Sequence, residues 1–260
     1  MKKENDILEK TLDIAESGYD NAYLFLLDAY KKAPENYGPQ TLYFLSCLAG
    51  GAGMPEKALK WLKYAIMDKG WWYRTEILED DDLELLENNS EFILLKSISN
   101  DRYTAAVAKT KSLFSWKQKC ADNLFLAVHG NTQNSEIARK DWLPIMEDDK
   151  LWQMETIQSA EPDGYGTYRW SYDMFSYTPV ANAIEKLQNI DYQKIVCGGF
   201  SAGCDMLLRS VCFSPAVCDM LILQSPWIPV LQEYGHDLVQ TLREKNITCL
   251  LYTSDAADEL

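Results

Sequence analysis

The pattern with the clearest chemistry lies in the C-terminal half, in the run Gly199-Phe200-Ser201-Ala202-Gly203. An apolar run, Ile195 to Cys197, precedes it, and a segment with apolar residues at helical spacing follows it. A serine flanked in this way is typical of a nucleophile, because the strained turn between strand and helix lifts its hydroxyl clear of the sheet. Gly199 and Gly203 let the strand and the helix approach each other closely. Ser201 is therefore the predicted nucleophile.

A second motif follows another apolar run. Asn123 to Val128 is a predicted strand, and His129-Gly130-Asn131-Thr132 comes directly after it. An oxyanion hole beside such a nucleophile takes one backbone N–H from the next residue, here Ala202, and one from the loop after an earlier strand. We expect the loop that begins at His129 to be that loop. The aromatic, glycine-rich stretch from Gly164 to Trp170 also follows a predicted strand, and we expect it to line the substrate pocket.

Together the two motifs resemble the α/β-hydrolase superfamily, in particular its small carboxylesterase and dienelactone-hydrolase-like branch, over roughly Cys120 to Thr248. The resemblance implies that Asn131 or Thr132 supplies the second oxyanion donor through its backbone; Asn131 is our choice. It also implies that His129 is structural and not the catalytic base. The activity it implies is hydrolysis of a small ester-like substrate through an acyl-enzyme, without cofactor or metal.

The catalytic acid and base are where the sequence departs from this family. The triad order in the family is serine, then Asp or Glu, then a histidine after the last strand. The chain has two histidines, and His129 precedes the serine. His236 lies in a predicted helix, residues 231–245, before the next strand, which is the wrong connection for a base. Asp255 follows the apolar run at 247–252 and occupies the position of the family's acid.

The tail offers an explanation for the missing base. Residues 249–259 resemble one reading frame of a sequencing-library adapter, so we expect 249–260 to be non-native and the natural sequence to have lost its last strands. The alternative is a hydrolase fold that has lost catalysis and keeps a binding role. The intact gene decides: a continuation past Thr248 with an acid and a later histidine supports truncation, and a natural stop after Leu260 contradicts it.

The first hundred residues show apolar side chains at helical spacing. Asp20 is the predicted N-cap of a helix that ends near Pro34, and Pro55 fits the first turn of another. Small and apolar residues recur after 36 positions: Ala22, Leu26 and Ala29, then Ala58, Leu62 and Ala65. This pattern resembles two degenerate tetratricopeptide repeats, which need further apolar surface to complete a core. We expect them to pack on the rest of the chain, and binding of a protein partner is the alternative.

Composition limits the classes of partner and compartment. Twenty-five Lys and Arg residues against 39 Asp and Glu give a net charge of −14, which disfavours nucleic acid and anionic membrane surfaces. No apolar run reaches the length of a membrane span. The seven cysteines are odd in number and lie mostly in apolar stretches, with spacings unsuited to zinc, so we expect reduced thiols and a cytoplasmic protein.

After Trp116, predicted strands at 123–128, 151–158, 194–199 and 220–224 alternate with helices, one opening at Pro179 and one at Ala202. Such alternation indicates a mostly parallel sheet. The sequence therefore predicts a C-terminally truncated α/β-hydrolase domain at 118–248, preceded by an all-α tetratricopeptide-like domain at 1–100. The predicted function is a serine hydrolase for an ester-like bond; an inactive binding scaffold and a peptidase of the same fold are the alternatives.

Overall fold

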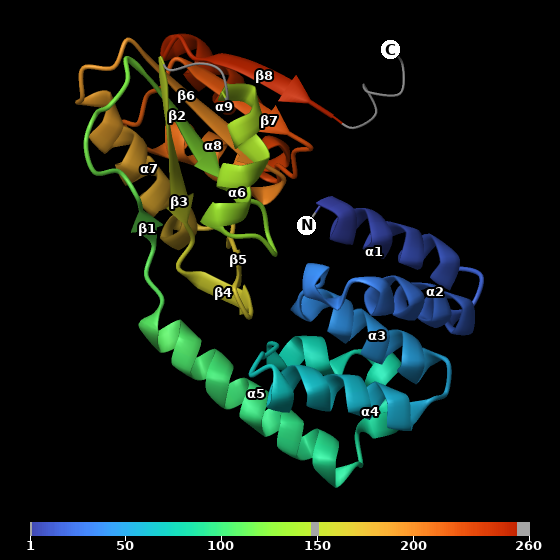
Figure 1. Cartoon of the computed structure of the whole chain (residues 1–260). Coiled ribbons are helices and arrows are strands. Elements are labelled where there is room, and N and C mark those ends of the chain that lie inside the picture. Colours follow the sequence, from blue (N-terminus) through green and yellow to red (C-terminus); the bar gives the residue numbers. More distant parts are fainter. Residues whose placement is uncertain (1, 147–150, 254–260) are drawn as a thin grey trace. The chain divides into compact units, whose positions relative to one another are not determined.

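A computed structural model describes residues 2–146 and 151–253 of the chain. The chain forms two compact units, Met1–Ala108 and Lys109–Leu260 (Figure 1). The regular elements described in the first unit are helices, whereas the second unit contains both β-sheets. Among the described residues, no helix is long and apolar enough to cross a membrane.

The α-helices described in the N-terminal unit are α1 (Lys2–Ala15), α2 (Tyr19–Lys32), α3 (Pro39–Gly51), α4 (Pro55–Lys63) and α5 (Ser90–Lys109). Helix α3 lies at the centre, since every residue from Leu45 to Gly50 is buried and the helix contacts both α2 and α4. The residues that echo one another at 36 positions include the fully buried Ala22, Leu26, Ala58 and Leu62. The tetratricopeptide resemblance itself stays a prediction.

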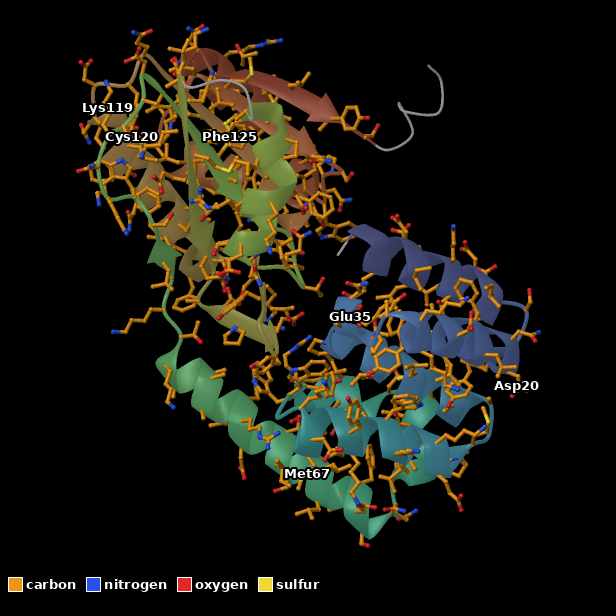
Figure 2. All side chains as sticks on the ribbon, in the orientation of Figure 1. Asp20, Glu35, Met67, Lys119, Cys120 and Phe125 are labelled. Atoms are coloured by element: carbon orange, nitrogen blue, oxygen red, sulfur yellow. The ribbon has the colours of Figure 1, made fainter. Side chains whose placement is uncertain are left out.

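The ends of two of these helices test sequence expectations. Pro55 is the first residue of α4, as predicted. The prediction for Asp20 is wrong, because α2 begins at Tyr19 and its N-cap is Gly18. Gly18 has φ 144°, a conformation that glycine adopts without a steric penalty. Asp20 instead lies exposed in the first helical turn, where Figure 2 labels it.

The C-terminal unit is built on a six-stranded sheet in the order β1-β3-β2-β6-β7-β8. Its strands are β1 (Leu113–Phe114), β2 (Asn123–Val128), β3 (Trp152–Gln158), β6 (Lys194–Phe200), β7 (Met220–Gln224) and β8 (Thr248–Tyr252). The β1–β3 pair is antiparallel, and the other pairs of this sheet are parallel. A small antiparallel ribbon of β4 (Glu161–Gly164) and β5 (Thr167–Arg169) follows β3. The four predicted strands are confirmed to within one residue at each end.

Helices cover both faces of the large sheet, as parallel strands require. They are α6 (Ser135–Trp142), α7 (Met174–Gln188), α8 (Ala202–Phe213) and α9 (Val230–Glu244). Leu124 and Leu126 of β2 belong to the core shared with α7, α8 and α9. Phe125, labelled in Figure 2, points to the opposite face and packs on Trp142 of α6, with ring centroids 5.1 Å apart. The period of two along β2 thus separates the two helical layers.

The start of α7 differs from the prediction. The helix begins at Met174, five residues before Pro179, because the Asp173 carboxylate accepts the N–H groups of Phe175 and Ser176 and caps the first turn. Pro179 lies inside the helix. Pro179 is the sixth residue of the helix, so its missing N–H leaves the Phe175 carbonyl without its helical hydrogen bond.

The last described strand involves the segment predicted to be foreign. Residues Thr248–Tyr252 pair in parallel with β7. A strand can form from native or foreign sequence, so the origin of the tail stays a prediction. Asp255 lies outside the described residues.

Candidate active site

The two predicted motifs end neighbouring strands at the point where the sheet topology reverses. Strand β2 continues through α6 to β3 on one side, and β6 continues through α8 to β7 on the other (Figure 1). The ends of β2 and β6 are paired, Val128 with Gly199. Open α/β sheets bind ligands at such a switch point, because the two connections diverge and leave the strand ends uncovered. The strand order alone therefore marks this edge as a candidate site.

Ser201 has a backbone conformation that few non-glycine residues adopt, with φ 50° and ψ −119°. Its N–H donates to the Gln224 carbonyl at 3.1 Å, and its own carbonyl accepts the N–H groups of Cys204 and Trp227 at 3.0 and 3.2 Å. These hydrogen bonds tie the turn to β7, to α8 and to the loop after β7. A strained backbone of this kind costs about 1–3 kcal/mol and persists only where its surroundings hold it.

Gly199 and Gly203 lie where β6, α8 and β2 approach most closely. A Cβ on Gly199 would be 2.8 Å from the carbonyl carbon of Gly203. A Cβ on Gly203 would be 2.6 Å from the carbonyl oxygens of Val128 and His129. All of these atoms belong to the backbone, so no side-chain rotation relieves the contact. Any larger residue at Gly203 would push α8 away from the end of β2.

Gly130 brings the loop after β2 against the same turn. A Cβ on Gly130 would be 3.3 Å from the Ser201 Cβ and 2.9 Å from Cδ1 of Phe200. The fold therefore places the loop that begins at His129 directly beside Ser201.

The backbone N–H groups of Ala202 and Asn131 have no hydrogen-bond partner among the described residues. Ala202 is the first residue of α8, so its N–H is one of the four that a helix leaves unbonded at its positive end. Asn131 follows Gly130 in the loop beside Ser201. Two such donors are suited to stabilise negative charge that develops on a reacting oxygen.

His129 is buried and bonded through both ring nitrogens. Nε2 accepts the Ser159 N–H at 3.1 Å, so Nδ1 carries the proton and donates to the Gly130 carbonyl at 2.7 Å. Burial lowers the pKa of His129 from its ordinary 6.5 to about 4. A neutral imidazole with both nitrogens engaged fits a structural role.

The sequence contains two further candidates for the acid and the base, His236 and Asp255. His236 lies on α9 with a side chain that is 93% exposed, beside Asp237 at 3.7 Å. Asp255 falls outside the described residues. The two histidines of the sequence are therefore a buried loop residue and an exposed helix residue.

Trp170 has a role that the sequence does not predict. We expected the stretch from Gly164 to Trp170 to line the substrate pocket. Trp170 is only 2% exposed, so its ring does not form part of a pocket surface. Its indole N–H donates to the His129 carbonyl at 2.7 Å, and its backbone N–H donates to Oδ1 of Asn131 at 2.8 Å. Its ring stacks on the His129 ring, with centroids 4.7 Å apart. The aromatic composition was the available signal, but composition does not tell which way a ring points.

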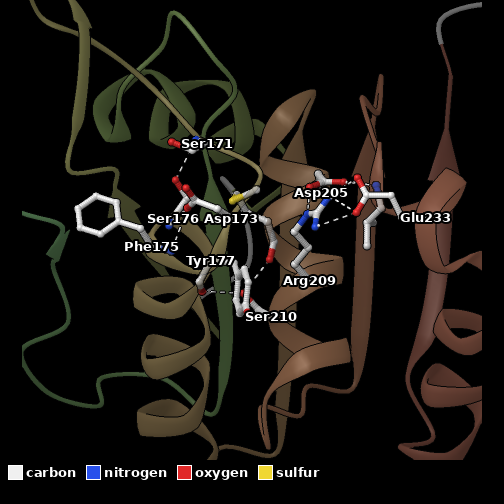
Figure 3. Close-up of polar contacts among 11 residues, drawn as sticks. Ser171, Asp173, Phe175, Ser176, Tyr177, Asp205, Arg209, Ser210 and Glu233 are labelled. Atoms are coloured by element: carbon white, nitrogen blue, oxygen red, sulfur yellow. Dashed lines mark hydrogen bonds and ion pairs between the residues drawn. The ribbon is translucent and has the colours of Figure 1, made fainter.

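A buried charged group on α8 was also not predicted from the sequence (Figure 3). Asp205 of α8 is fully buried; one carboxylate oxygen accepts the Val230 N–H at 2.8 Å, and the other lies 2.5 Å from Nε of Arg209. Arg209 also pairs with the exposed Glu233 of α9 at 3.3 Å. Burial raises the pKa of Asp205, and its hydrogen bonds and Arg209 oppose that rise. The group links α8 to the start of α9.

One group of metal-ligand types is found among the described residues, in the N-terminal unit. Ligand atoms of Cys47, Asp80 and Asp82 lie within 4.8 Å of one another. The Asp80 carboxylate already accepts the Tyr43 hydroxyl at 2.7 Å and the Asp82 N–H at 2.9 Å, where it caps a short helix. Burial raises the pKa of the Cys47 thiol to about 12, which disfavours the thiolate that a metal binds. Existing hydrogen bonds thus account for this cluster.

Comparison with known proteins matches residues 3–107 to a family described as the N-terminal domain of A/B hydrolase-like proteins. This match supports a relation to the α/β-hydrolase superfamily, and the mostly parallel sheet of the second unit fits such a fold. No curated protein matches the chain.

Among solved structures, an uncharacterized protein from Bacillus cereus is 24% identical, with a TM-score of 0.46, over 98% of this chain and 85% of its own. A Bacillus cereus carboxylesterase is 14% identical, with a TM-score of 0.37, over 59% of this chain and 88% of its own. A phospholipase/carboxylesterase from Dyadobacter fermentans is 11% identical, with a TM-score of 0.38, over 56% of this chain and 88% of its own.

Proposed function

We propose that the chain is a serine hydrolase that acts on a carboxylic ester-like bond through an acyl-enzyme at Ser201. The observation that carries this proposal is the position of Ser201, a strained non-glycine residue at the switch point of the sheet, beside Gly130. The family match to hydrolase-like proteins supports the reaction class. A small ester is the proposed substrate.

In the proposed reaction, Oγ of Ser201 attacks the ester carbonyl carbon and forms a new C–O bond. The carbonyl electron pair moves onto its oxygen, and the N–H groups of Ala202 and Asn131 donate to that oxyanion. The tetrahedral intermediate collapses, the bond to the alcohol oxygen breaks, and the alcohol leaves with a proton. Water then adds to the acyl carbon and releases the acid and free Ser201.

The proton released by Ser201 needs an acceptor. Among the described residues, His129 is engaged at both ring nitrogens and the His236 side chain is 93% exposed, so neither histidine is placed to accept it. We propose that solvent water takes the proton. Enzymes that lose a triad member keep about 10³–10⁴-fold acceleration over water, supplied by the oxyanion hole and by binding. We expect turnover of that order. Deacylation also needs a base, so the acyl-enzyme should accumulate.

A second candidate function is binding without catalysis. Within residues 2–146 and 151–253, no histidine bonds the Ser201 side chain, and this favours it, since a scaffold has no need of a base. The helical unit would then supply the contact with a protein partner, and the C-terminal unit would act as its support.

Acylation by p-nitrophenyl acetate distinguishes the two. The proposal predicts that mass mapping finds the acetyl group on Ser201, that Ser201→Ala abolishes this modification, and that Ser225→Ala leaves it unchanged. Ser225 is a matched control because it also follows a strand and has a positive φ of 42°, but it lacks flanking glycines. Absence of acylation at Ser201 would favour the binding scaffold.

A further inference from the structure

The loop of residues 129–133 is held by hydrogen bonds on several sides. The Gly130 N–H donates to Oε1 of Gln133 at 2.9 Å, and the Gln133 carbonyl accepts the Tyr168 N–H at 2.8 Å. The His129 ring is bonded to Ser159 and to Gly130. The Asn131 N–H, in contrast, has no partner among the described residues.

Gly130 makes the backbone of this loop flexible unless the surrounding hydrogen bonds restrict it. Its lack of a side chain is required by the close approach to Ser201. The same lack gives the backbone more conformational freedom than any other residue would. A flexible residue immediately before the Asn131 N–H would let that donor point in several directions, whereas oxyanion stabilisation depends on donors that are fixed in advance.

Trp170 holds the loop on both sides of Gly130. Its indole N–H binds the carbonyl before the glycine, that of His129, and its backbone N–H binds the side chain after it, that of Asn131. The indole also stacks on the His129 ring and is itself fully enclosed. The indole thus fixes the His129–Gly130 peptide unit directly. It fixes the Gly130–Asn131 unit through the His129 ring on which it stacks, because Nδ1 of that ring donates to the Gly130 carbonyl.

We propose that Trp170 is a positioning residue for the oxyanion hole, which aims the Asn131 N–H at the substrate carbonyl oxygen. This inference rests on the proposed function, because it gives that N–H a reacting partner. Trp170 does not contact the reacting atoms and acts through the His129–Asn131 backbone.

The test replaces Trp170 with Phe, which keeps an aromatic ring on His129 but removes the indole N–H. We expect the saturating rate constant of Ser201 acylation by p-nitrophenyl acetate to fall by about tenfold or more, short of the roughly 10²–10³-fold expected when an oxyanion donor is lost entirely. The concentration of half-saturation should stay within about twofold, because ground-state binding is not altered. Loss of a merely structural residue would not lower the saturating rate constant while leaving the half-saturation concentration unchanged.

Trp142→Phe is the matched control. Trp142 is 5% exposed and packs on Phe125 against the other face of the sheet. The variant therefore makes the same change from a buried indole to a phenyl ring, but on the opposite side of the sheet. Ser201 of this variant should be acylated at the parent rate.

Amide hydrogen exchange over residues 129–133 gives a measurement that does not depend on catalysis. Trp170→Phe should speed exchange there by about tenfold, and Trp142→Phe should not. A Trp170→Phe variant that matches the parent in exchange and in acylation overturns the inference. If Ser201 of the parent chain is never acylated, the proposed function is wrong. The exchange result then still decides whether Trp170 fixes the loop.

Discussion

The Cβ of Ser201 lies 3.3 Å from the position that a side chain would first occupy on Gly130. The contact joins the loop after β2 to the turn after β6, the two segments that the proposed reaction needs side by side. An atom added at Gly130 would therefore displace Ser201 relative to the loop after β2.

Gly130→Ala should separate activity from stability. The added methyl group meets Cδ1 of Phe200 at 2.9 Å, a ring that is able to shift, so we expect a loss of about 1–2 kcal/mol in the free energy of unfolding. It also displaces Ser201 relative to the Asn131 N–H, and acylation by p-nitrophenyl acetate should fall by about tenfold or more. Acylation at the parent rate would contradict this arrangement.

Gly203→Ala should instead damage the fold. Its Cβ would meet the carbonyl oxygens of Val128 and His129 at 2.6 Å. Val128 is held in β2, and the His129 carbonyl is held by the Trp170 indole. We expect the free energy of unfolding to fall by about 3 kcal/mol or more, measured by urea denaturation.

The control for this variant is Gly235→Ala on α9, where an added Cβ meets nothing within 4 Å. There the free energy of unfolding should change by less than about 1 kcal/mol, because the added Cβ clashes with nothing and Gly235 directly follows the non-helical Tyr234 (φ −137°, ψ 22°). Equal effects of the two substitutions would contradict the close approach of Gly203 to the Val128 and His129 carbonyl oxygens.

His129 should make the protein less stable in mild acid. The folded state keeps the imidazole neutral down to about pH 4, whereas the unfolded chain binds a proton below its ordinary pKa of 6.5. The unfolded state therefore binds more protons between these values, and stability falls as the pH is lowered through this range. From about pH 7.5 to about pH 5.5 this linkage amounts to about 1.3 kcal/mol.

His129→Gln is the reference for that measurement, because glutamine stays neutral and offers an oxygen that accepts hydrogen bonds. Urea denaturation of both chains at the two pH values isolates the contribution of His129 from that of the carboxylates. The loss of stability in acid should be smaller for the variant by about 1.3 kcal/mol. Identical losses would mean that His129 is not held neutral.

The two carboxylates that bind Arg209 should differ sharply in their contribution to stability. Asp205→Ala leaves a 5% exposed guanidinium without its buried partner and leaves the Val230 N–H without an acceptor, so we expect a loss of about 3–5 kcal/mol. Glu233 is 49% exposed, and Glu233→Ala should cost less than about 1 kcal/mol. Denaturation midpoints of the two variants provide the check, and similar values would place the Asp205 pair in solvent.

The sequence by itself determined the local elements and the predicted nucleophile. The run from Gly199 to Gly203 falls between β6 and α8 because a period of two, a pair of glycines and a period of 3.6 are all properties of neighbouring residues. Strand β2 and the start of α4 were predicted for the same reason. Asp20 was misassigned because the Gly18 φ of 144°, which sets the start of α2, leaves no mark in the pattern of side chains.

Only the tertiary structure decided what lies around Ser201. The switch point depends on the order of strands, which joins residues 128 and 199 through backbone pairing and not through any local signal. Trp170 and Asp205 gained their roles from hydrogen bonds to partners 39 and 25 positions away. Such contacts depend on which face of an element is buried and against what, and the free energy of that burial belongs to the assembled sheet and helices, not to any segment alone.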